Sequence, residues 1–308
     1  MSTTHTPESQ QRRGALRGTV DSVRTYELST PQKLMIFVLS MSLFGLANII
    51  LEVIPDVTLG PVDISVSYMV FVPLVVAALF SPLWAALGAP LGEIIFTDLL
   101  MGDFSGLAEL EGYIQMFLAI YIAGSMVRNP RNRAQIFTAA VMVVVIDKLL
   151  SAAVDLSKVW IGVEDAEYVE GLPESVLALE AIGFGVDIVM SGILLGAIPA
   201  MWLIPQLHGK IEPLMGLRPR VPGEPIPGNA PKNATFVAAF VLLALASFGL
   251  AFMEAFDLAP GAWEPDFLDR FGDNFIWVGA GAVLVVLIVS VVLFRASQRT
   301  TERRTPRG

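Results

Sequence analysis

Eight long apolar runs dominate this chain of 308 residues and restrict the folds open to it. They lie near residues 34–51, 65–81, 82–100, 112–127, 135–155, 176–205, 235–256 and 275–294. A helix that crosses the hydrocarbon of a bilayer needs about 20 apolar residues. Because lipid cannot satisfy backbone polar groups, such runs are expected to be helical. The pattern therefore predicts an all-α integral membrane protein with eight spans.

Composition excludes several other classes of protein. Hydrophobic residues make up 54% of the chain and charged residues 16%, against about 25% charged residues in soluble domains. A net charge of −9 argues against a nucleic-acid binder, which needs a basic surface to neutralise phosphates. Cysteine is absent and there are only two histidines, so we expect no metal site. Nucleotide-binding and hydrolase motifs are missing, so we expect no enzyme activity and no cofactor.

The distribution of basic residues predicts the orientation. Lysine and arginine accumulate in cytoplasmic loops of membrane proteins. With the N-terminus inside, all 20 basic residues except Lys148, Lys158 and Arg270 fall in cytoplasmic segments or tails. Acidic residues concentrate in the loops on the other side, and arginine greatly outnumbers lysine, as in proteins of salt-adapted archaea. We therefore expect a haloarchaeal cell-membrane protein with both termini cytoplasmic.

Five segments follow from these patterns. Residues 1–32 form a cytoplasmic tail, in which apolar residues at helical spacing fit either an amphipathic helix at the membrane surface or a solvated linker. Residues 33–210 form a six-helix bundle. A linker rich in proline and glycine covers 211–234, a two-helix extension covers 235–295, and a basic tail covers 296–308.

Proline and glycine predict local geometry within the spans. The Ser81–Pro82 step is expected to separate two helices of a tight hairpin. Pro199 is the expected bend in the sixth run, which is too long for one upright helix. Gly88 and Gly92 have the spacing that allows close packing of membrane helices.

Ionisable residues inside apolar spans are costly, and so they are the first candidates for a functional site. Most of them fall in the outer halves of the predicted spans, where aromatic residues accompany them. The candidate substrate-binding residues are Glu93, Asp98, Tyr113, Phe117, Asp147, Lys148, Glu180, Phe184 and Asp187. Together they predict a pocket for a small polar or zwitterionic molecule.

Structural roles are an alternative for several of these residues. Asp147 and Lys148 also fit a pair that holds spans together. Glu180 also fits a residue at a helix start, where a negative charge suits the helix dipole. The aromatic residues also fit packing within the bundle.

Residues 60–127 show a more specific pattern. The stretch GPVDISVSYMVFVPLVVAALFSPLWAALGAPLGEIIFTDLL, followed by an acidic loop and GYIQMFLAIYIAGSMV, resembles the substrate-binding S components of energy-coupling factor (ECF) vitamin transporters. The features that carry the resemblance are Pro61, Pro73, Pro82, Gly88, Gly92, Glu93, Asp98 and Gly124, with a basic loop at Arg128 to Arg133. The resemblance covers residues 33–210, and the last two spans are additional to it.

The resemblance implies a fold and a function. S components are six-helix membrane proteins that bind a vitamin or related micronutrient in a pocket open to the outside. Transport then requires a transmembrane T subunit and two cytoplasmic ATPases. We therefore expect a substrate-capture subunit of an uptake transporter. The alternative is a non-transporting membrane anchor that uses the same fold to recruit cytoplasmic partners, and a proton-coupled transporter is a third possibility.

Overall fold

The computed structural model describes residues 28–52, 57–59, 62–64, 66–101, 104, 106–162, 176–227, 229, 234–256 and 258. Its elements are α2 (Thr30–Glu52), β1 (Val57–Leu59), β2 (Val62–Ile64), α3 (Phe71–Leu79), α4 (Pro82–Glu93), η1 (Ile94–Asp98), α5 (Leu99–Met101), α6 (Leu107–Met126), α7 (Arg133–Ile161), α8 (Val176–Asp187), η2 (Ile188–Ala197), α9 (Ile198–Leu207), η3 (Pro213–Met215) and α10 (Ala234–Ala255). Residues 1–27 of the predicted N-terminal tail, the eighth apolar run at 275–294 and the basic C-terminal tail lie outside the described residues. The last residues of that N-terminal tail already belong to α2.

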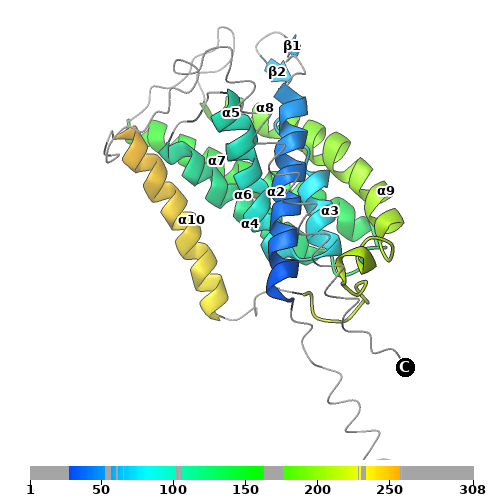
Figure 1. The fold of residues 1–308 in the computed structure, drawn as a ribbon. Coiled ribbons are helices and arrows are strands. Elements are labelled where there is room, and N and C mark those ends of the chain that lie inside the picture. Colours follow the sequence, from blue (N-terminus) through cyan, green and yellow to red (C-terminus); the bar gives the residue numbers. More distant parts are fainter. Residues whose placement is uncertain are drawn as a thin grey trace, which may run out of the picture.

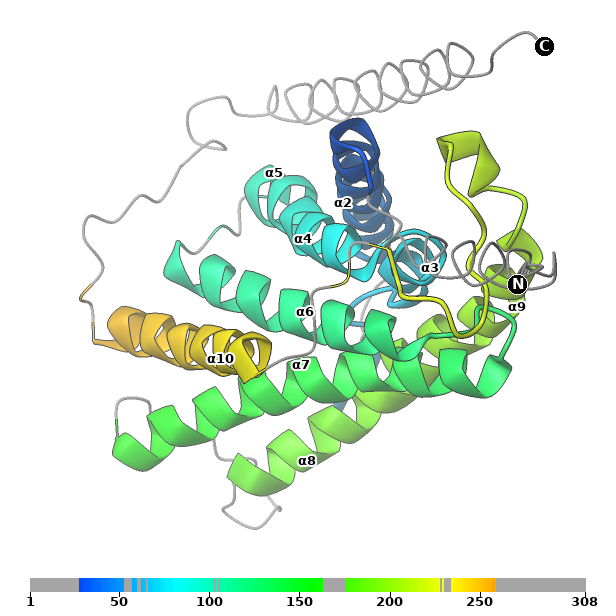
Figure 2. The same ribbon diagram turned by 90° about the horizontal axis from the view of Figure 1, so that it is seen from below.

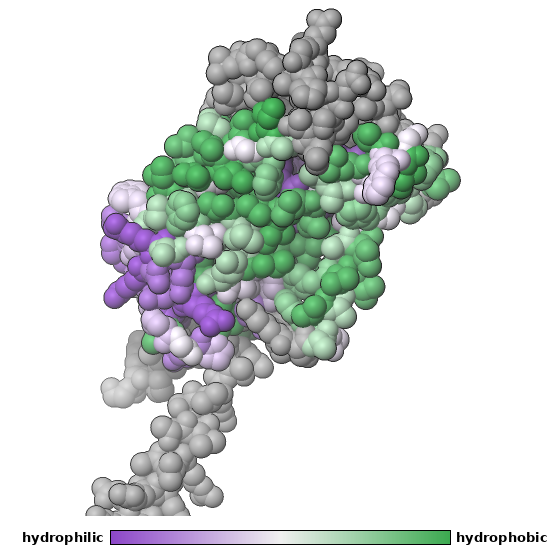
Figure 3. All heavy atoms as spheres, turned by 180° about the vertical axis from the view of Figure 1, so that it is seen from behind, coloured by the Kyte–Doolittle hydropathy of each residue, from purple (hydrophilic) through white to green (hydrophobic). Residues whose placement is uncertain are grey.

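Within this described part, four helices are long and apolar enough to cross a membrane: Thr30–Leu51, Arg133–Ile161, Ala181–Leu207 and Ala234–Ala255. Large apolar side chains stand exposed on these helices, with Trp202 64% and Leu242 65% exposed. Figure 3 shows a broad apolar surface, with hydrophilic residues gathered toward one end. A helical fold with apolar outer faces is what a lipid environment requires. The prediction of a helical protein with several apolar helices that could cross a membrane is therefore confirmed. The strands β1 and β2 pair as a short antiparallel hairpin.

Helices α6 and α7 run side by side through the middle of the bundle (Figure 2). Helix α10 packs against α6 on one side, and α4 packs against α6 on the other, with α2 beyond it. The strands β1 and β2 extend past the end of α2 (Figure 1). We call the end of the bundle that carries these strands the hairpin end.

Three glycines let α2 and α4 approach closely. A Cβ atom at Gly88 would lie 2.2 Å from the Phe37 carbonyl oxygen, and one at Gly92 would lie 2.0 Å from the Met41 carbonyl oxygen. Gly45 of α2 faces Gly92 in turn. Real Cβ atoms do not come so near to backbone, so only glycine fits at these positions. The predicted close packing through Gly88 and Gly92 is therefore confirmed, and it takes place within the chain.

The second apolar run, 65–81, is helical over only the nine residues of α3. This is shorter than the full span that its hydropathy predicts, because residues 66–69 have no regular secondary structure. Ser81 has φ −150° and ψ 122°, and Pro82 follows in the first turn of α4. The predicted break between two helices at this step is confirmed. Its cause is the steric effect of proline on the preceding residue.

Two helical stretches widen into π-helix. Segment η1 follows Pro90, which lies inside α4. Segment η2 ends at Ala197, two residues before Pro199 in the first turn of α9. Proline lacks an N–H group and its ring crowds the carbonyl four residues earlier, which here lies within η2, so the regular hydrogen-bond ladder cannot run through Pro199. The sequence predicts a bend at Pro199, and the structure has the ten π-helical residues of η2 directly before α9.

The residues after α9 pack under the end of the bundle opposite the hairpin end. Arg220, which is 7% exposed, donates hydrogen bonds to the carbonyl oxygens of Ala77 (2.6 Å), Phe80 (3.4 Å) and Val127 (3.1 Å). These carbonyls belong to the C-terminal ends of α3 and α6, which lack intrahelical partners. One guanidinium therefore caps two helices.

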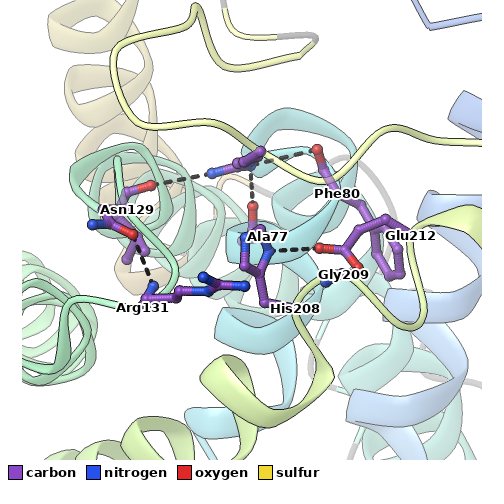
Figure 4. Close-up of polar contacts among 9 residues, drawn as sticks. Ala77, Phe80, Asn129, Arg131, His208, Gly209 and Glu212 are labelled. Carbon is purple, nitrogen blue, oxygen red and sulfur yellow. Dashed lines mark hydrogen bonds and ion pairs between the residues drawn. The ribbon is translucent and has the colours of Figure 1, made fainter.

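Glu212 supports the same region. It is fully buried, its Oε1 lies 2.8 Å from His208 Nδ1, and its Oε2 accepts a 2.8 Å hydrogen bond from the Gly209 N–H (Figure 4). Burial lowers the pKa of Arg220 to about 9, and the negative charge of Glu212 opposes this shift. Arg220 therefore stays charged at neutral pH. The first part of the segment predicted as a linker is thus packed against the bundle.

Candidate functional site

A polar cavity of about 270 Å³ lies among α4, η1, α6 and α7, beside the segment that joins β2 to α3. Most of the residues that line it carry a charged or hydrogen-bonding side chain, whereas the rest of the bundle is largely apolar. The lining residues are Ser67, Tyr68, Pro90, Glu93, Ile94, Asp98, Glu109, Gly112, Tyr113, Gln115, Met116, Asp147, Lys148 and Ser151. We call this the polar cavity.

Asp147 and Tyr68 form the deepest polar contact of its wall. Asp147, near the middle of α7, is 8% exposed. The Tyr68 hydroxyl donates a 2.6 Å hydrogen bond to Asp147 Oδ2. Tyr68 comes from the irregular residues before α3, and the contact therefore ties that segment to α7. A buried carboxylate needs such a donor, because burial without one is costly.

Lys148 is paired with a carboxylate from another helix. Its Nζ lies 3.4 Å from Asp187 Oδ2 and 5.6 Å from the centre of the Tyr68 ring. Asp187 also accepts a hydrogen bond from the Ser67 hydroxyl, and the Ser67 N–H donates to Ser191 Oγ at 3.1 Å. The ion pair joins α7 to the end of α8. An ammonium group inside an apolar bundle requires such a partner.

Glu93 differs from these residues because no hydrogen bond or ion pair engages its carboxylate within the described part of the chain. It ends α4 directly before η1, and it lines the polar cavity. Its carboxylate feels the negative charges of Asp98, Asp147 and Glu109, and the positive charge of Lys148. The carboxylate oxygens of Glu93 are therefore available to accept hydrogen bonds from a molecule in the cavity.

Several residues named from the sequence meet at this cavity. Glu93, Asp98, Tyr113, Asp147 and Lys148 all line it. Asp187 joins them through its ion pair with Lys148. The Asp147–Lys148 pairing considered as an alternative does not form as such, because Asp147 binds Tyr68 and Lys148 binds Asp187.

Other predicted site residues lie elsewhere. Phe117 is a correction: it does not line the cavity but packs in an aromatic cluster between α6 and α10, with ring centres 6.1 Å from Tyr121 and 6.2 Å from Phe240. Helix α10, which docks on α6, covers Phe117. Phe184 is half-buried and is not part of the cavity wall. The side chain of Glu180 lies outside the described residues.

Sequence reasoning missed part of the wall. Ser67 and Tyr68 escaped notice because the run 65–81 was predicted to be helical throughout. Glu109 lies one helical turn before Tyr113 on the same face of α6, and Gln115 also lines the cavity. The sequence did offer one signal for Tyr68, which lies near the edge of an apolar run. A buried tyrosine hydroxyl usually has a hydrogen-bond partner, so this tyrosine indicated a polar contact within the bundle.

Both π-helical segments flank this cavity. Ile94 and Asp98, the first and last residues of η1, are in its wall. Segment η2 begins directly after Asp187 and contains Ser191, which anchors the Ser67 backbone. Short π-helical segments often occur at functional sites, where they redirect side chains. Their placement supports a functional role for the polar cavity.

The chemistry available here is that of binding. Charged groups, hydroxyls and an amide surround a space of molecular size, which fits the polar recognition of a small ligand. Among the described residues, no three acidic or histidine side chains come together as a group that would hold a metal ion. The charge-assisted hydrogen bonds that this wall offers are stronger than neutral ones.

Comparisons with known proteins identify one family. The sequence profile of a family of unknown function, DUF8171, matches residues 35–303. No match was found among curated proteins or among solved structures.

Proposed function

We propose that this chain, which belongs to the DUF8171 family, is a membrane protein that captures a small polar molecule in the polar cavity. It would serve as the substrate-capture subunit of an ECF-type uptake transporter. The observation that carries the proposal is a cavity lined by Glu93, Asp147 and Lys148 inside a bundle of apolar helices. Such groups are costly in this environment, and they mark substrate pathways in membrane proteins.

The proposed topology has eight spans and both termini in the cytoplasm, with the hairpin end outside. Support comes from the exposed basic residues at the opposite end. They are Arg128, Arg131, Arg133, Lys210 and Arg218. Basic residues gather on the cytoplasmic side of membrane proteins, so this arrangement favours a cavity that opens outward.

Binding in the proposed mechanism needs no reaction. The ligand enters from outside and replaces water around the charged wall. Its polar groups then form hydrogen bonds with the carboxylate of Glu93 and with other polar side chains of the wall. The low dielectric constant of the surrounding bundle strengthens these bonds. Energy for release inward would come from two partner ATPases and a T subunit, because the chain has no nucleotide-binding motif.

A bulky side chain at Gly112 tests this function. Gly112 belongs to the cavity wall, and a Cβ atom there meets no other atom within 4 Å. Gly112→Trp is therefore expected to fill the cavity without disturbing the fold. Small molecules released by denaturing the purified protein are measured by mass spectrometry, and the variant should retain less than a tenth of the ligand that the native protein holds.

Gly249→Trp is the matched control. Gly249 lies on α10 with nothing within 4 Å of its Cβ position, and it is not part of the cavity wall. This variant should hold as much ligand as the native protein. Equal retention by Gly112→Trp and the native protein would contradict ligand capture in the polar cavity.

A further inference from the structure

Acidic groups outnumber basic ones on the wall of the polar cavity. Glu93, Asp98, Glu109 and Asp147 line it, and Lys148 is the one basic residue among the lining residues. Asp187, from behind the wall, already balances the charge of Lys148 at 3.4 Å. The wall therefore has no basic group left to attract an anion.

Glu93 and Asp147 differ in the partners that their carboxylates already have. Asp147 already accepts the Tyr68 hydroxyl at 2.6 Å. Glu93 makes no hydrogen bond or ion pair with the described residues, and it faces the repulsion of Asp98, Asp147 and Glu109. A carboxylate in this position gains most from a positively charged partner, since the attraction acts in a medium of low dielectric constant.

The size of the cavity and the nature of its wall limit the partner further. A volume of about 270 Å³ corresponds to roughly nine waters at about 30 Å³ each. Tyr68 and Tyr113 belong to the wall, and aromatic rings attract organic cations. The Lys148 ammonium already lies 5.6 Å from the centre of the Tyr68 ring, so Tyr113 is the aromatic residue of the wall left for a ligand. In the described part of the chain, the acidic side chains do not converge as metal ligands.

We propose that the ligand of the polar cavity is a small organic cation, whose ammonium or amidinium group is received by Glu93. This inference rests on the proposed capture function and specifies its substrate class. The positive group lies against Glu93, while the rest of the molecule contacts Tyr113. The selectivity of the cavity is then one of charge: cations bind, and neutral or anionic molecules of the same shape do not.

Matched compounds that differ only in charge test the proposal. One set is choline and its uncharged carbon analogue, in which carbon replaces nitrogen. A second set is butylammonium, butanol and butyrate. Each is titrated into the full-length protein in lipid nanodiscs, and binding is measured by ligand-observed NMR and by the rise in unfolding temperature. The cations are expected to bind at least tenfold more tightly than their neutral and anionic counterparts.

Two variants locate the charge effect. Glu93→Gln should weaken binding of the cations at least tenfold and remove most of the preference for charge. Glu224→Gln is the matched control, because Glu224 is exposed and lies outside the cavity wall. It should leave binding unchanged. If Glu93→Gln does not fold, the comparison of cations with their isosteres on the native protein decides alone.

The outcomes separate this inference from the capture function. Binding of butanol or butyrate at least as tight as that of butylammonium, blocked by Gly112→Trp, would overturn the cationic ligand and leave capture intact. Cation binding unaffected by Glu93→Gln would overturn the assignment of Glu93. Failure of every compound, charged or neutral, to bind would overturn the capture function itself.

Discussion

Gly92→Ala is expected to destabilise the protein by about 3 kcal/mol, at the upper end of the usual cost of overpacking. The added Cβ would meet the Met41 carbonyl oxygen at 2.0 Å and the Met41 carbonyl carbon at 2.8 Å. Both are backbone atoms that cannot rotate away, so α2 and α4 must separate. Glu93 and η1 follow directly in the chain, and the cavity wall should therefore be distorted as well.

The measurement is thermal unfolding in detergent, followed by intrinsic fluorescence. Gly249→Ala is the control, because nothing lies within 4 Å of its Cβ position on α10. Alanine favours a helix over glycine by about 1 kcal/mol, so this variant should be as stable as the native protein or more so. Equal stability of Gly92→Ala and Gly249→Ala would mean that α2 and α4 do not pack closely at Gly92.

Arg220→Met is expected to lower the free energy of unfolding by about 3 kcal/mol. Methionine keeps much of the apolar stem but removes three hydrogen bonds from a charged donor, each worth roughly 1.5–3 kcal/mol. Relief from burying the guanidinium offsets part of this loss. The carbonyl groups of Ala77, Phe80 and Val127 would remain at the ends of α3 and α6 without this donor.

Denaturant unfolding of matched variants measures this effect. Arg131→Met is the control, because Arg131 is exposed in the loop between α6 and α7 and a surface substitution changes stability by about 0.5 kcal/mol or less. Arg220→Lys should fall between the two, since an ammonium group cannot reproduce the planar fork of donors. If Arg220→Met and Arg131→Met unfold alike, Arg220 does not hold the two helix ends.

Much of the helical framework was predictable from the sequence because each helix is encoded by its own neighbours. The runs at 34–51, 112–127, 135–155 and 235–256 coincide closely with α2, α6, α7 and α10. The break at Ser81–Pro82 follows from local sterics. These features depend on contiguous residues, so hydropathy and proline positions were sufficient.

The candidate site was predictable where a charge lies in an apolar run. Glu93, Asp98, Asp147 and Lys148 were identified in this way, and the structure brings them to one cavity. Tyr68 was missed because its role depends on the non-helical backbone before α3, which an apolar run does not reveal. Pairing Lys148 with Asp187 required knowledge of how α7 and α8 pack.

Contacts between segments that are distant in the sequence account for the remaining differences between the predictions and the structure. Phe117 was expected at the cavity, yet Phe240 of α10 packs against it. Arg220 lies in a segment whose proline and glycine content predicts a linker, and its burial depends on the ends of α3 and α6. Neither contact has a local signal in the sequence, because the partners are far apart along the chain.

The measurement that tests the central claim most directly is purification of the tagged native protein from its own membranes in mild detergent. Copurifying proteins and small molecules are then identified together by mass spectrometry. We predict a small organic cation in the preparation, together with two ATPases and a helical T subunit. Cytoplasmic scaffolding partners, with no ATPase and no retained small molecule, would contradict the capture function and favour a membrane anchor.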